Sequence, residues 1–382
     1  MGGQAFAKSG PGGTAILVPR MPTEVYRRVA AEIQSQLEPI FHQVSIPRDV
    51  PGKPDHGDID FLVEGSLSQW TPHSIGKDIG AEYHVKHGNT LSYAVPYPGL
   101  PNAYVQVDVE VSPGNGSAEA VELYNWTWFM KAYSDLLQIV GVCHRSLGLT
   151  CNDKGLHLRV AEIEPYNKKK SLLFLTRDPS EAMTFYGFNV VKYWDGFADM
   201  DEIYEWVVDG CFFSRTIFED RIEKNNDRAR LRKRPMYSKF VDEWIPSHSS
   251  LGKDRKIWTR DEVLQEALTT FSKQEEYAQM MEEHNTREQE EALWRSIREK
   301  IPAENAALGL ALKGLKRWVG FTDGQPYIME VPLLEDQPLW SKAITSESEL
   351  LEWVSEHWGE AKRLEKERAG AAKAAGKTNT GL

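Results

Sequence analysis

Apolar side chains recur at every fourth position early in the chain, which is the spacing of one face of an α-helix. The apolar residues of this segment are Val25, Val29, Ile33 and Leu37. They predict an amphipathic helix over Thr23–Leu37, and Pro22 stands where a first helical turn tolerates proline.

Alternation of polar and apolar side chains follows this segment and predicts β-strands. The predicted strands are 42–46, 58–63, 83–87, 91–97 and 103–111. Gly88 and Asn89 separate two of them by the length of a tight hairpin turn. A helix followed by a meander of strands predicts an α+β fold.

The pattern becomes helical over residues 121–147 and stays mainly helical to about residue 358. One such helix, at 274–300, mixes acidic and basic side chains with few apolar ones, so we expect it to be exposed or to face a protein partner. The predicted divisions are a Gly-rich segment at 1–20, a first domain at 21–165, a mainly helical domain at 166–360 and a disordered tail at 361–382.

Composition narrows the classes of function. The formal net charge is −11 and the pI about 5.5, which argues against a surface that wraps nucleic acid by unspecific phosphate neutralisation. The odd number of cysteines, three, lacks metal-ligand spacing and favours a reducing compartment. No apolar run approaches the roughly 20 residues of a membrane span. We expect an intracellular, cytoplasmic protein with no membrane contact, and a nuclear location stays open.

Two aspartates stand out in the strand predicted at 58–63. Asp58 and Asp60 are two positions apart and therefore project from one face, while Ile59 and Phe61 enter the core on the other. Mg²⁺ takes few protein carboxylates together with substrate phosphates, so a rigid pair of this kind suits a magnesium site.

The strand predicted at 103–111 supplies a further acid. Its valines alternate with polar residues, which places Asp108 and Glu110 together on the polar face. If the two strands are neighbours, Asp108 meets Asp58 and Asp60 around a pair of ions, as two-metal phosphoryl transfer requires. Glu110 is the alternate metal ligand.

Three other interpretations compete with this one. Acidic faces that only meet water are common in antiparallel sheets, although like charges on neighbouring positions repel unless a cation relieves them. A calcium-binding loop is excluded because Leu62 and Val63 stand where it needs an oxygen ligand and a glycine. A sugar-nucleotide glycosyltransferase, which uses an Asp-x-Asp pair with manganese, remains a weaker alternative.

These residues resemble the signature of the polymerase β superfamily of nucleotidyltransferases. The matching motifs are Gly57-Asp58-Ile59-Asp60-Phe61 and Val107-Asp108-Val109. A closer resemblance, to nucleotidyltransferase-like proteins of phages and fungi, spans about the first 110 residues and includes Gly2-Gly3-Gln4-Ala5-Phe6, Arg20-Met21, Gly52-Lys53 and Gln106-Val107-Asp108. The resemblance implies a nucleotidyltransferase-fold mixed sheet with flanking helices at 21–165.

The resemblance also implies roles for the acids. The first two aspartates of the family bind both metal ions, and the third binds the catalytic ion and helps to deprotonate the attacking hydroxyl; these roles carry over to Asp58, Asp60 and Asp108. The implied cofactor is Mg²⁺ or Mn²⁺. The implied substrates are a nucleoside triphosphate such as ATP and an acceptor hydroxyl on RNA or a small molecule.

One departure concerns phosphate binding. The family's Gly-Ser or Gly-Gly motif should stand shortly before Asp58, but the interval 45–53 lacks it. The expected nucleotide-binding residues are therefore Arg48, Gly52, Lys53, His56 and Gly57. Arg48 and Lys53 can equally balance nearby aspartates, and His56 can cap its own loop. A catalytically silent nucleotide- or partner-binding protein on the same fold is thus the main alternative.

Overall fold

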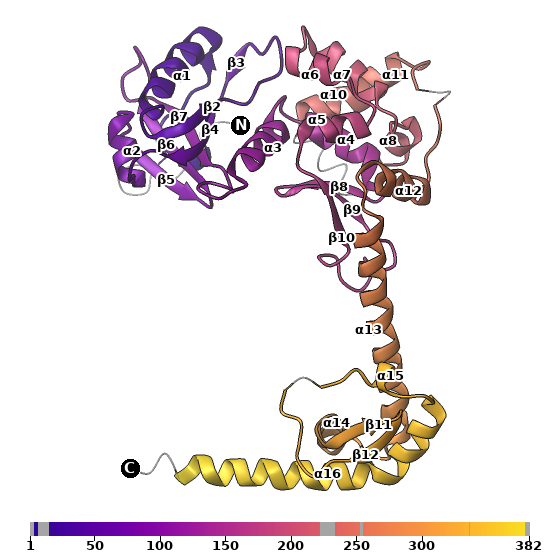
Figure 1. The fold of residues 1–382 in the computed structure, drawn as a ribbon. Coiled ribbons are helices and arrows are strands. Elements are labelled where there is room, and N and C mark those ends of the chain that lie inside the picture. Colours follow the sequence, from indigo (N-terminus) through magenta and orange to yellow (C-terminus); the bar gives the residue numbers. More distant parts are fainter. Residues whose placement is uncertain (1–3, 7–14, 222–233, 253–254, 336, 379–382) are drawn as a thin grey trace. The chain divides into compact units, whose positions relative to one another are not determined.

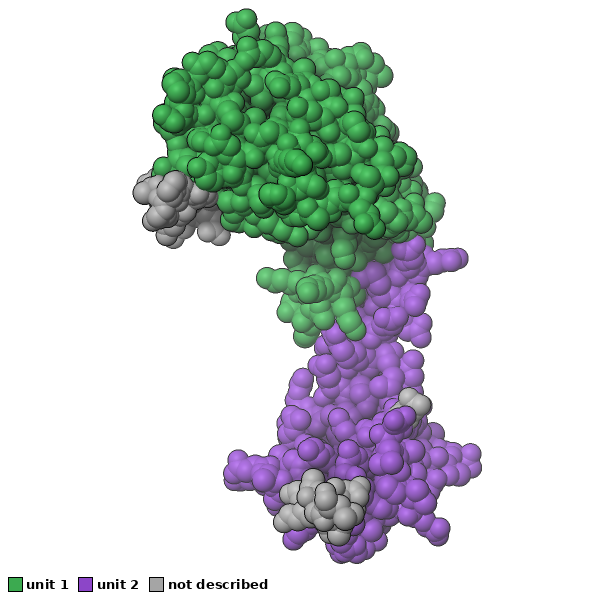
Figure 2. Space-filling model, turned by 90° about the vertical axis from the view of Figure 1, so that its left-hand side faces the viewer, with its two compact units in different colours: residues 1–274 green, residues 275–382 purple. Residues whose placement is uncertain are grey.

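The computed structural model describes residues 4–6, 15–221, 234–252, 255–335 and 337–378. The chain divides into two compact units, Met1–Gln274 and Glu275–Leu382, which Figure 2 colours separately. Most of the predicted Gly-rich segment, including Gly2 and Gly3, lies outside the described residues. Within the described ranges, no helix combines the length and the apolar character needed to cross a lipid bilayer.

A mixed β-sheet organises the first part of unit 1 and confirms the predicted α+β class. Its strand order is β2-β4-β7-β6-β5; β4 and β7 are parallel, and the other neighbours are antiparallel (Figure 1). The strands are β2 (Phe41–Ser45), β4 (Asp58–Ser66), β5 (Tyr83–His87), β6 (Thr90–Pro96) and β7 (Tyr104–Val111). Each strand predicted from alternation corresponds to one of these, with small differences at the ends.

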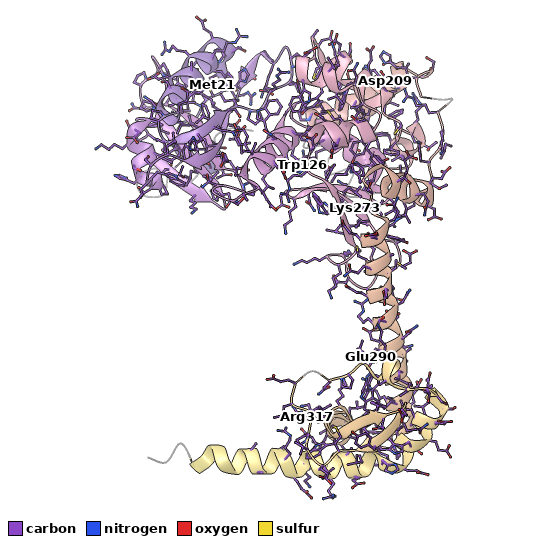
Figure 3. All side chains as sticks on the ribbon, in the orientation of Figure 1. Met21, Trp126, Asp209, Lys273, Glu290 and Arg317 are labelled. Carbon is purple, nitrogen blue, oxygen red and sulfur yellow. The ribbon has the colours of Figure 1, made fainter. Side chains whose placement is uncertain are left out.

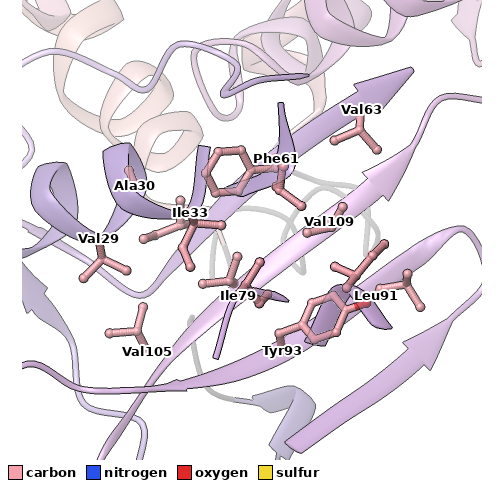
Figure 4. Close-up of a cluster of buried hydrophobic side chains, with 14 of the residues drawn as sticks. Val29, Ala30, Ile33, Phe61, Val63, Ile79, Leu91, Tyr93, Val105 and Val109 are labelled. Atoms are coloured by element: carbon pink, nitrogen blue, oxygen red, sulfur yellow. The ribbon is translucent and has the colours of Figure 1, made fainter. Parts of the chain in front are cut away.

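One face of this sheet packs on an apolar core. The helices that contribute to it are α1 (Thr23–Leu37) and α2 (Pro72–Asp78). Ile59, Phe61 and Val63 of β4 are at most 1% exposed and pack with Val29 and Ile33 of α1 (Figure 4). The predicted helix over Thr23–Leu37 is confirmed, and burial of its apolar stripe explains why β4 presents its other residues to the opposite face.

Helix α3 (Ala120–Lys131) covers only part of that opposite face. Leu62 and Glu64, in the second half of β4, are at most 6% exposed. Asp58 and Asp60, in the first half, stay accessible. A short antiparallel pairing of β1 (Met21–Pro22) with β3 (Asp55–His56) leads into this end of β4. The strand therefore changes from a covered face to an open one along its own length.

The helical pattern predicted over 121–147 forms two helices, α3 and α4 (Leu136–Arg145). Between them, Tyr133 and Ser134 both adopt left-handed backbone conformations, with φ of 58° and 57°. Residues other than glycine rarely adopt this conformation, and such strain tends to occur at functional sites. The break redirects the chain beside the accessible end of β4.

The rest of unit 1 is mostly helical. Within the part of unit 1 that the structure describes, the other α-helices are α5 (Pro179–Phe185), α6 (Val190–Asp195), α7 (Met200–Asp209), α8 (Arg215–Arg221), α10 (Pro235–Lys239), α11 (Ile245–Ser247) and α12 (Arg260–Thr270). A small antiparallel sheet, which the sequence pattern did not predict, joins β8 (Leu149–Asn152), β9 (Gly155–Arg159) and β10 (Leu172–Thr176). The predicted domain boundary near residue 165 falls between two of its paired strands. Trp126, labelled in Figure 3, ties α3 to β8 by donating from Nε1 to the Asn152 carbonyl oxygen at 2.7 Å.

Unit 2 packs helices around a hairpin and its own apolar core. Its elements are α13 (Gln274–Lys300), α14 (Asn305–Trp318), β11 (Val319–Thr322), β12 (Gln325–Ile328), α15 (Trp340–Ala343) and α16 (Glu347–Thr378). Leu315, Trp340 and Val354 are at most 1% exposed in that core. The helix predicted at 274–300 is confirmed, whereas the hairpin was not predicted.

The chain end differs from the predicted disordered tail at 361–382, because α16 continues to Thr378. Ala361 is fully buried, and the buried Glu365 carboxylate is ion-paired with Arg317 of α14 and with Arg368. Composition suggested an unpacked end because alanine is small. Here the small side chain instead allows α16 to approach Gly314 of α14 closely.

We expect Gly314→Ala to destabilise unit 2 by about 1–3 kcal/mol, because the added methyl would overlap the Ala361 carbonyl group. Gly309→Ala is a matched control on the same helix, since nothing lies within 4 Å of its added methyl. The control should stabilise the helix by about 0.5–1 kcal/mol. Amide hydrogen exchange of α14 and α16 in the full chain measures both effects. Equal protection in the two variants would contradict the close helix contact.

Candidate functional site

The three predicted catalytic aspartates lie on adjacent strands. In the parallel pairing of β4 with β7, Asp60 is the register partner of Asp108, and Asp58 is the partner of Gln106. Paired strands are about 4.8 Å apart, and paired residues of parallel strands project to the same face. The structure therefore brings Asp58, Asp60 and Asp108 to one face of the sheet, as predicted.

Of the three aspartates, Asp60 has the carboxyl group with the most strongly raised pKa. Desolvation, together with the neighbouring negative charges of Asp58 and Asp108, raises the pKa of its carboxyl group to about 7. The Asp60 side chain remains exposed in the pocket. The desolvation therefore comes from the protein atoms that surround the pocket and not from complete burial of the carboxyl group. A cation at this position would relieve both the repulsion and the lost hydration.

Asp108 is held in place by donors from both sides. Gln106 Nε2 donates to the two carboxylate oxygens of Asp108 at 3.1 and 3.0 Å, and Ser92, its partner on β6, also hydrogen-bonds to it. Desolvation raises the pKa of the Asp108 carboxyl group, while these hydrogen bonds act to lower it. Asp108 is thus an oriented carboxylate beside a less restrained Asp60.

Glu110, the predicted alternate metal ligand, is engaged by other groups. Its carboxylate accepts from Thr90 Oγ1 at 3.1 Å and lies 2.8 Å from Lys131 Nζ at the end of α3. Its register partner on β4 is the buried Leu62. Glu110 therefore fixes Lys131 near the aspartates, and the Lys131 charge acts on both Asp60 and Asp108.

A pocket of about 320 Å³ opens at this face. Its lining residues are Tyr26, Ile46, Pro47, Arg48, Asp49, Lys53, Asp58, Asp60, Lys131 and Ser134. Two of the four predicted acids, Asp58 and Asp60, line it directly. The size lies at the lower end of the range for small-ligand sites.

Metal binding at this face would need an open site. Among the described residues, no three acidic, histidine or cysteine side chains gather closely enough to make a ready-made metal cage. Carboxylates on one sheet face repel one another, and Mg²⁺ completes its octahedral shell with water and substrate phosphates. The oxygen donors of Asp58, Asp60 and Asp108 suit such a hard divalent cation chemically.

Arg48 lines the pocket but also links it to the helices of unit 1. Its Nη1 donates to the Trp194 carbonyl oxygen at 2.6 Å, with Tyr133 Oη at 3.2 Å and the Tyr193 carbonyl oxygen at 3.4 Å. The Tyr133 backbone N–H donates in turn to the Arg48 carbonyl oxygen at 2.6 Å. The loop that forms the pocket wall is therefore fastened to the end of α6.

Lys53 and His56 surround one aspartate of the preceding loop. Lys53 Nζ lies 2.5 Å and His56 Nδ1 lies 3.3 Å from Asp49 Oδ2. The His56 ring is buried and stacks on Tyr26 with ring centroids 3.9 Å apart, and desolvation followed by the Lys53 charge lowers its pKa. Lys53 thus forms an ion pair with Asp49 and also lines the pocket. His56 does not line the pocket but packs against Tyr26 and Asp49, which do.

The two predicted glycines are not among the lining residues of the pocket. Gly52 sits in a turn with φ of 70°, and no atom lies within 4 Å of a Cβ placed there. Gly57 is buried immediately before β4. The sequence also carries a segment rich in basic residues at 228–234. Residues 228–233 lie outside the described residues, and Arg234 Nη1 is 2.7 Å from Asp135 Oδ1.

Sequence reasoning missed Tyr26, Asp49, Lys131 and Ser134 of the pocket. Lys131 gave no separate signal, because it follows an aromatic-rich helical segment about twenty residues beyond Asp108. The adjacent left-handed pair at 133–134 has no glycine to announce it. Only the tertiary structure brings these residues to the pocket that Asp58 and Asp60 line.

Comparison with models of known protein families gave no match, and comparison with curated proteins gave no significant match.

Proposed function

We propose that this chain is a metal-dependent nucleotidyltransferase on the nucleotidyltransferase fold of the polymerase β superfamily. The observation that carries the proposal is the parallel register of β4 and β7, which pairs Asp60 with Asp108 and keeps Asp58 on the same open face. The mixed sheet, the pocket and the raised pKa of the Asp60 carboxyl group support it. An acidic sheet face that only contacted water would not require basic side chains around a pocket.

The residues that would hold Mg²⁺ or Mn²⁺ are Asp58, Asp60 and Asp108. Bound there, the ions would neutralise the negative charge of a nucleoside triphosphate during phosphoryl transfer. Lys131 and Lys53 add positive charge near the pocket, and each already has one acidic neighbour. The chain's own contribution is mainly positioning and charge complementarity.

The reaction exchanges one bond for another. The acceptor hydroxyl oxygen forms a bond to the α-phosphorus, the bond from that phosphorus to the bridging oxygen of the β-phosphate breaks, and pyrophosphate leaves. The hydroxyl proton passes to Asp108, whose carboxylate Gln106 and Ser92 orient. The acceptor lies on RNA or on a small molecule.

A catalytically silent nucleotide-binding protein is the second candidate. Arg48 is occupied by carbonyl oxygens and Lys53 by Asp49, and the family's Gly-Ser motif is absent. Incubation with each labelled nucleoside triphosphate and total RNA separates the two candidates. Pyrophosphate release with labelled product supports the enzyme, whereas tight calorimetric binding without release across a panel of acceptors supports the silent protein.

Asp58→Asn and Asp60→Asn should each lower metal-dependent nucleotide transfer by at least about a hundredfold, because each removes charge that organises the transferring phosphate. The thermal unfolding midpoint should not fall, since each change relieves like-charge repulsion. Asp78→Asn, at the exposed end of α2, is the matched control and should retain activity. Chelation of divalent ions should abolish transfer in the wild type. Full activity in Asp60→Asn would refute the assignment.

Lys131→Met should weaken binding of the nucleoside triphosphate by about ten- to a hundredfold, because a charge-assisted phosphate contact is worth about 1.5–3 kcal/mol. The methionine keeps the length of the side chain. Lys86→Met, an exposed lysine of β5 outside the pocket, is the control. Titration calorimetry with a non-hydrolysable triphosphate measures both variants. Equal affinities would place the phosphates away from Lys131.

A further inference from the structure

Unit 2 contains a second pocket, of about 490 Å³, that lies outside the proposed nucleotidyltransferase site. Helices α13 and α14 and the segment leading into α15 line it. Its lining includes Trp294, Arg295 and Arg298 of α13, Lys316 of α14, and Pro338 and Leu339. Its size is that of a small-ligand site.

Apolar and aromatic surface forms one part of this pocket. The half-buried Trp294 ring packs against Trp340, with centroids 4.6 Å apart. Leu339 is 43% exposed, and Pro338 is also exposed. Small-ligand sites are commonly lined by aromatic and apolar side chains of this kind.

Three exposed cations border the same surface. Among the ion pairs of the described residues, none joins Arg295, Arg298 or Lys316 to an acid. The Lys316 ammonium lies 4.7 Å from the centroid of the Trp294 ring, so positive charge and an aromatic side chain stand together. These three side chains concentrate positive charge locally in a chain whose formal net charge is −11.

The two acids of the pocket are occupied elsewhere. Glu290, labelled in Figure 3, accepts from Trp294 Nε1 at 2.6 Å and from the backbone N–H groups of Trp340 and Ser341 at 3.2 and 2.8 Å. Glu291 Oε1 lies 3.6 Å from Arg287 Nε. Glu290 therefore fixes the wall of the pocket, and neither acid neutralises the three cations.

We propose that this pocket binds single-stranded nucleic acid, with a nucleobase against Trp294 and Leu339 and the adjoining phosphates at Arg295, Arg298 and Lys316. Proteins that bind single strands combine aromatic side chains, on which bases stack, with a cationic path for the backbone. An acidic peptide would satisfy the cations but leave the aromatic and apolar surface unused. The inference does not depend on the proposed nucleotidyltransferase activity, and RNA and DNA share the required chemistry.

Fluorescence anisotropy of the full chain with a labelled single-stranded 12-nucleotide RNA, and with DNA of the same sequence, tests this site. The variant with Arg295→Ser, Arg298→Ser and Lys316→Ser should bind at least tenfold more weakly at low salt. Loss of three phosphate contacts should also flatten the slope of log affinity against log salt by about 2. A difference between the RNA and DNA arms identifies the preferred strand.

A matched triple variant controls for net charge. Lys313→Ser, Lys342→Ser and Arg363→Ser remove three exposed cations of unit 2 that do not line the pocket. This variant should keep most of the affinity and nearly the full salt slope. Retained affinity and slope in the pocket variant would place the oligonucleotide elsewhere and overturn the proposal, as would an absence of oligonucleotide binding by the wild type.

Trp294→Leu separates stacking from charge. It should weaken binding by about tenfold without changing the salt slope, because stacking releases no counterions. Trp294→Phe keeps an aromatic face and should restore most of the affinity. Unchanged affinity in Trp294→Leu, or displacement of the oligonucleotide by an equimolar acidic peptide, would also overturn the proposal.

Discussion

Repulsion among carboxylates on two paired strands is the physical constraint on which the chemistry of unit 1 depends. The parallel pairing of β4 with β7 leaves Asp60 no freedom to move away from Asp108, because both strands are fixed by their ladders and by the core beneath. The surrounding groups stabilise the carboxylates of Asp108 and Asp60 to different extents. Asp108 receives hydrogen bonds from Gln106 and Ser92, whereas Asp60 keeps a carboxyl group whose ionisation is disfavoured. A positive charge near this pair would stabilise the ionised form of the Asp60 carboxyl group.

Helix α3 joins the structural and chemical roles of this sheet. Its body covers Leu62 and Glu64, and its last residue, Lys131, reaches the acidic face through Glu110. The left-handed pair that follows turns the chain so that Tyr133 meets Arg48. Helix α3 and the residues directly after it thus cover one half of this sheet face and border the open half. They also connect the pocket wall to the remaining helices of unit 1. In unit 2, by contrast, the Glu290 carboxylate accepts hydrogen bonds from backbone N–H groups. Among the described residues it forms no ion pair with the cations near it.

Periodicity along the sequence predicted the elements that pack in a regular way. Alternation in the strands and fourfold spacing in α1 revealed which side chains enter the core. That placed Asp58 and Asp60 on one face of their strand and Asp108 on the polar face of another, whereas the pairing that joins the two strands is seen only in the structure. The hairpin β11–β12, the strands β8–β10 and the continued helix after residue 361 escaped prediction, because short strands and small residues leave weak patterns. Residues such as Lys131 and Tyr26 join the pocket only through tertiary contact. The same holds for the Arg48 hydrogen bonds, which link positions far apart in the chain.

The parallel pairing has a consequence for how the protein folds. Asp58 and Asp108 are about fifty residues apart, so their strands can meet only after a long stretch of chain has been closed, at a cost in entropy. Local pieces such as the β5–β6 hairpin need no such closure and can form sooner. We therefore expect the acidic face to be assembled late, after such local pieces have formed. In a partly folded chain the aspartates would then stay apart and hydrated. They would repel one another only after the core that holds their strands together had formed.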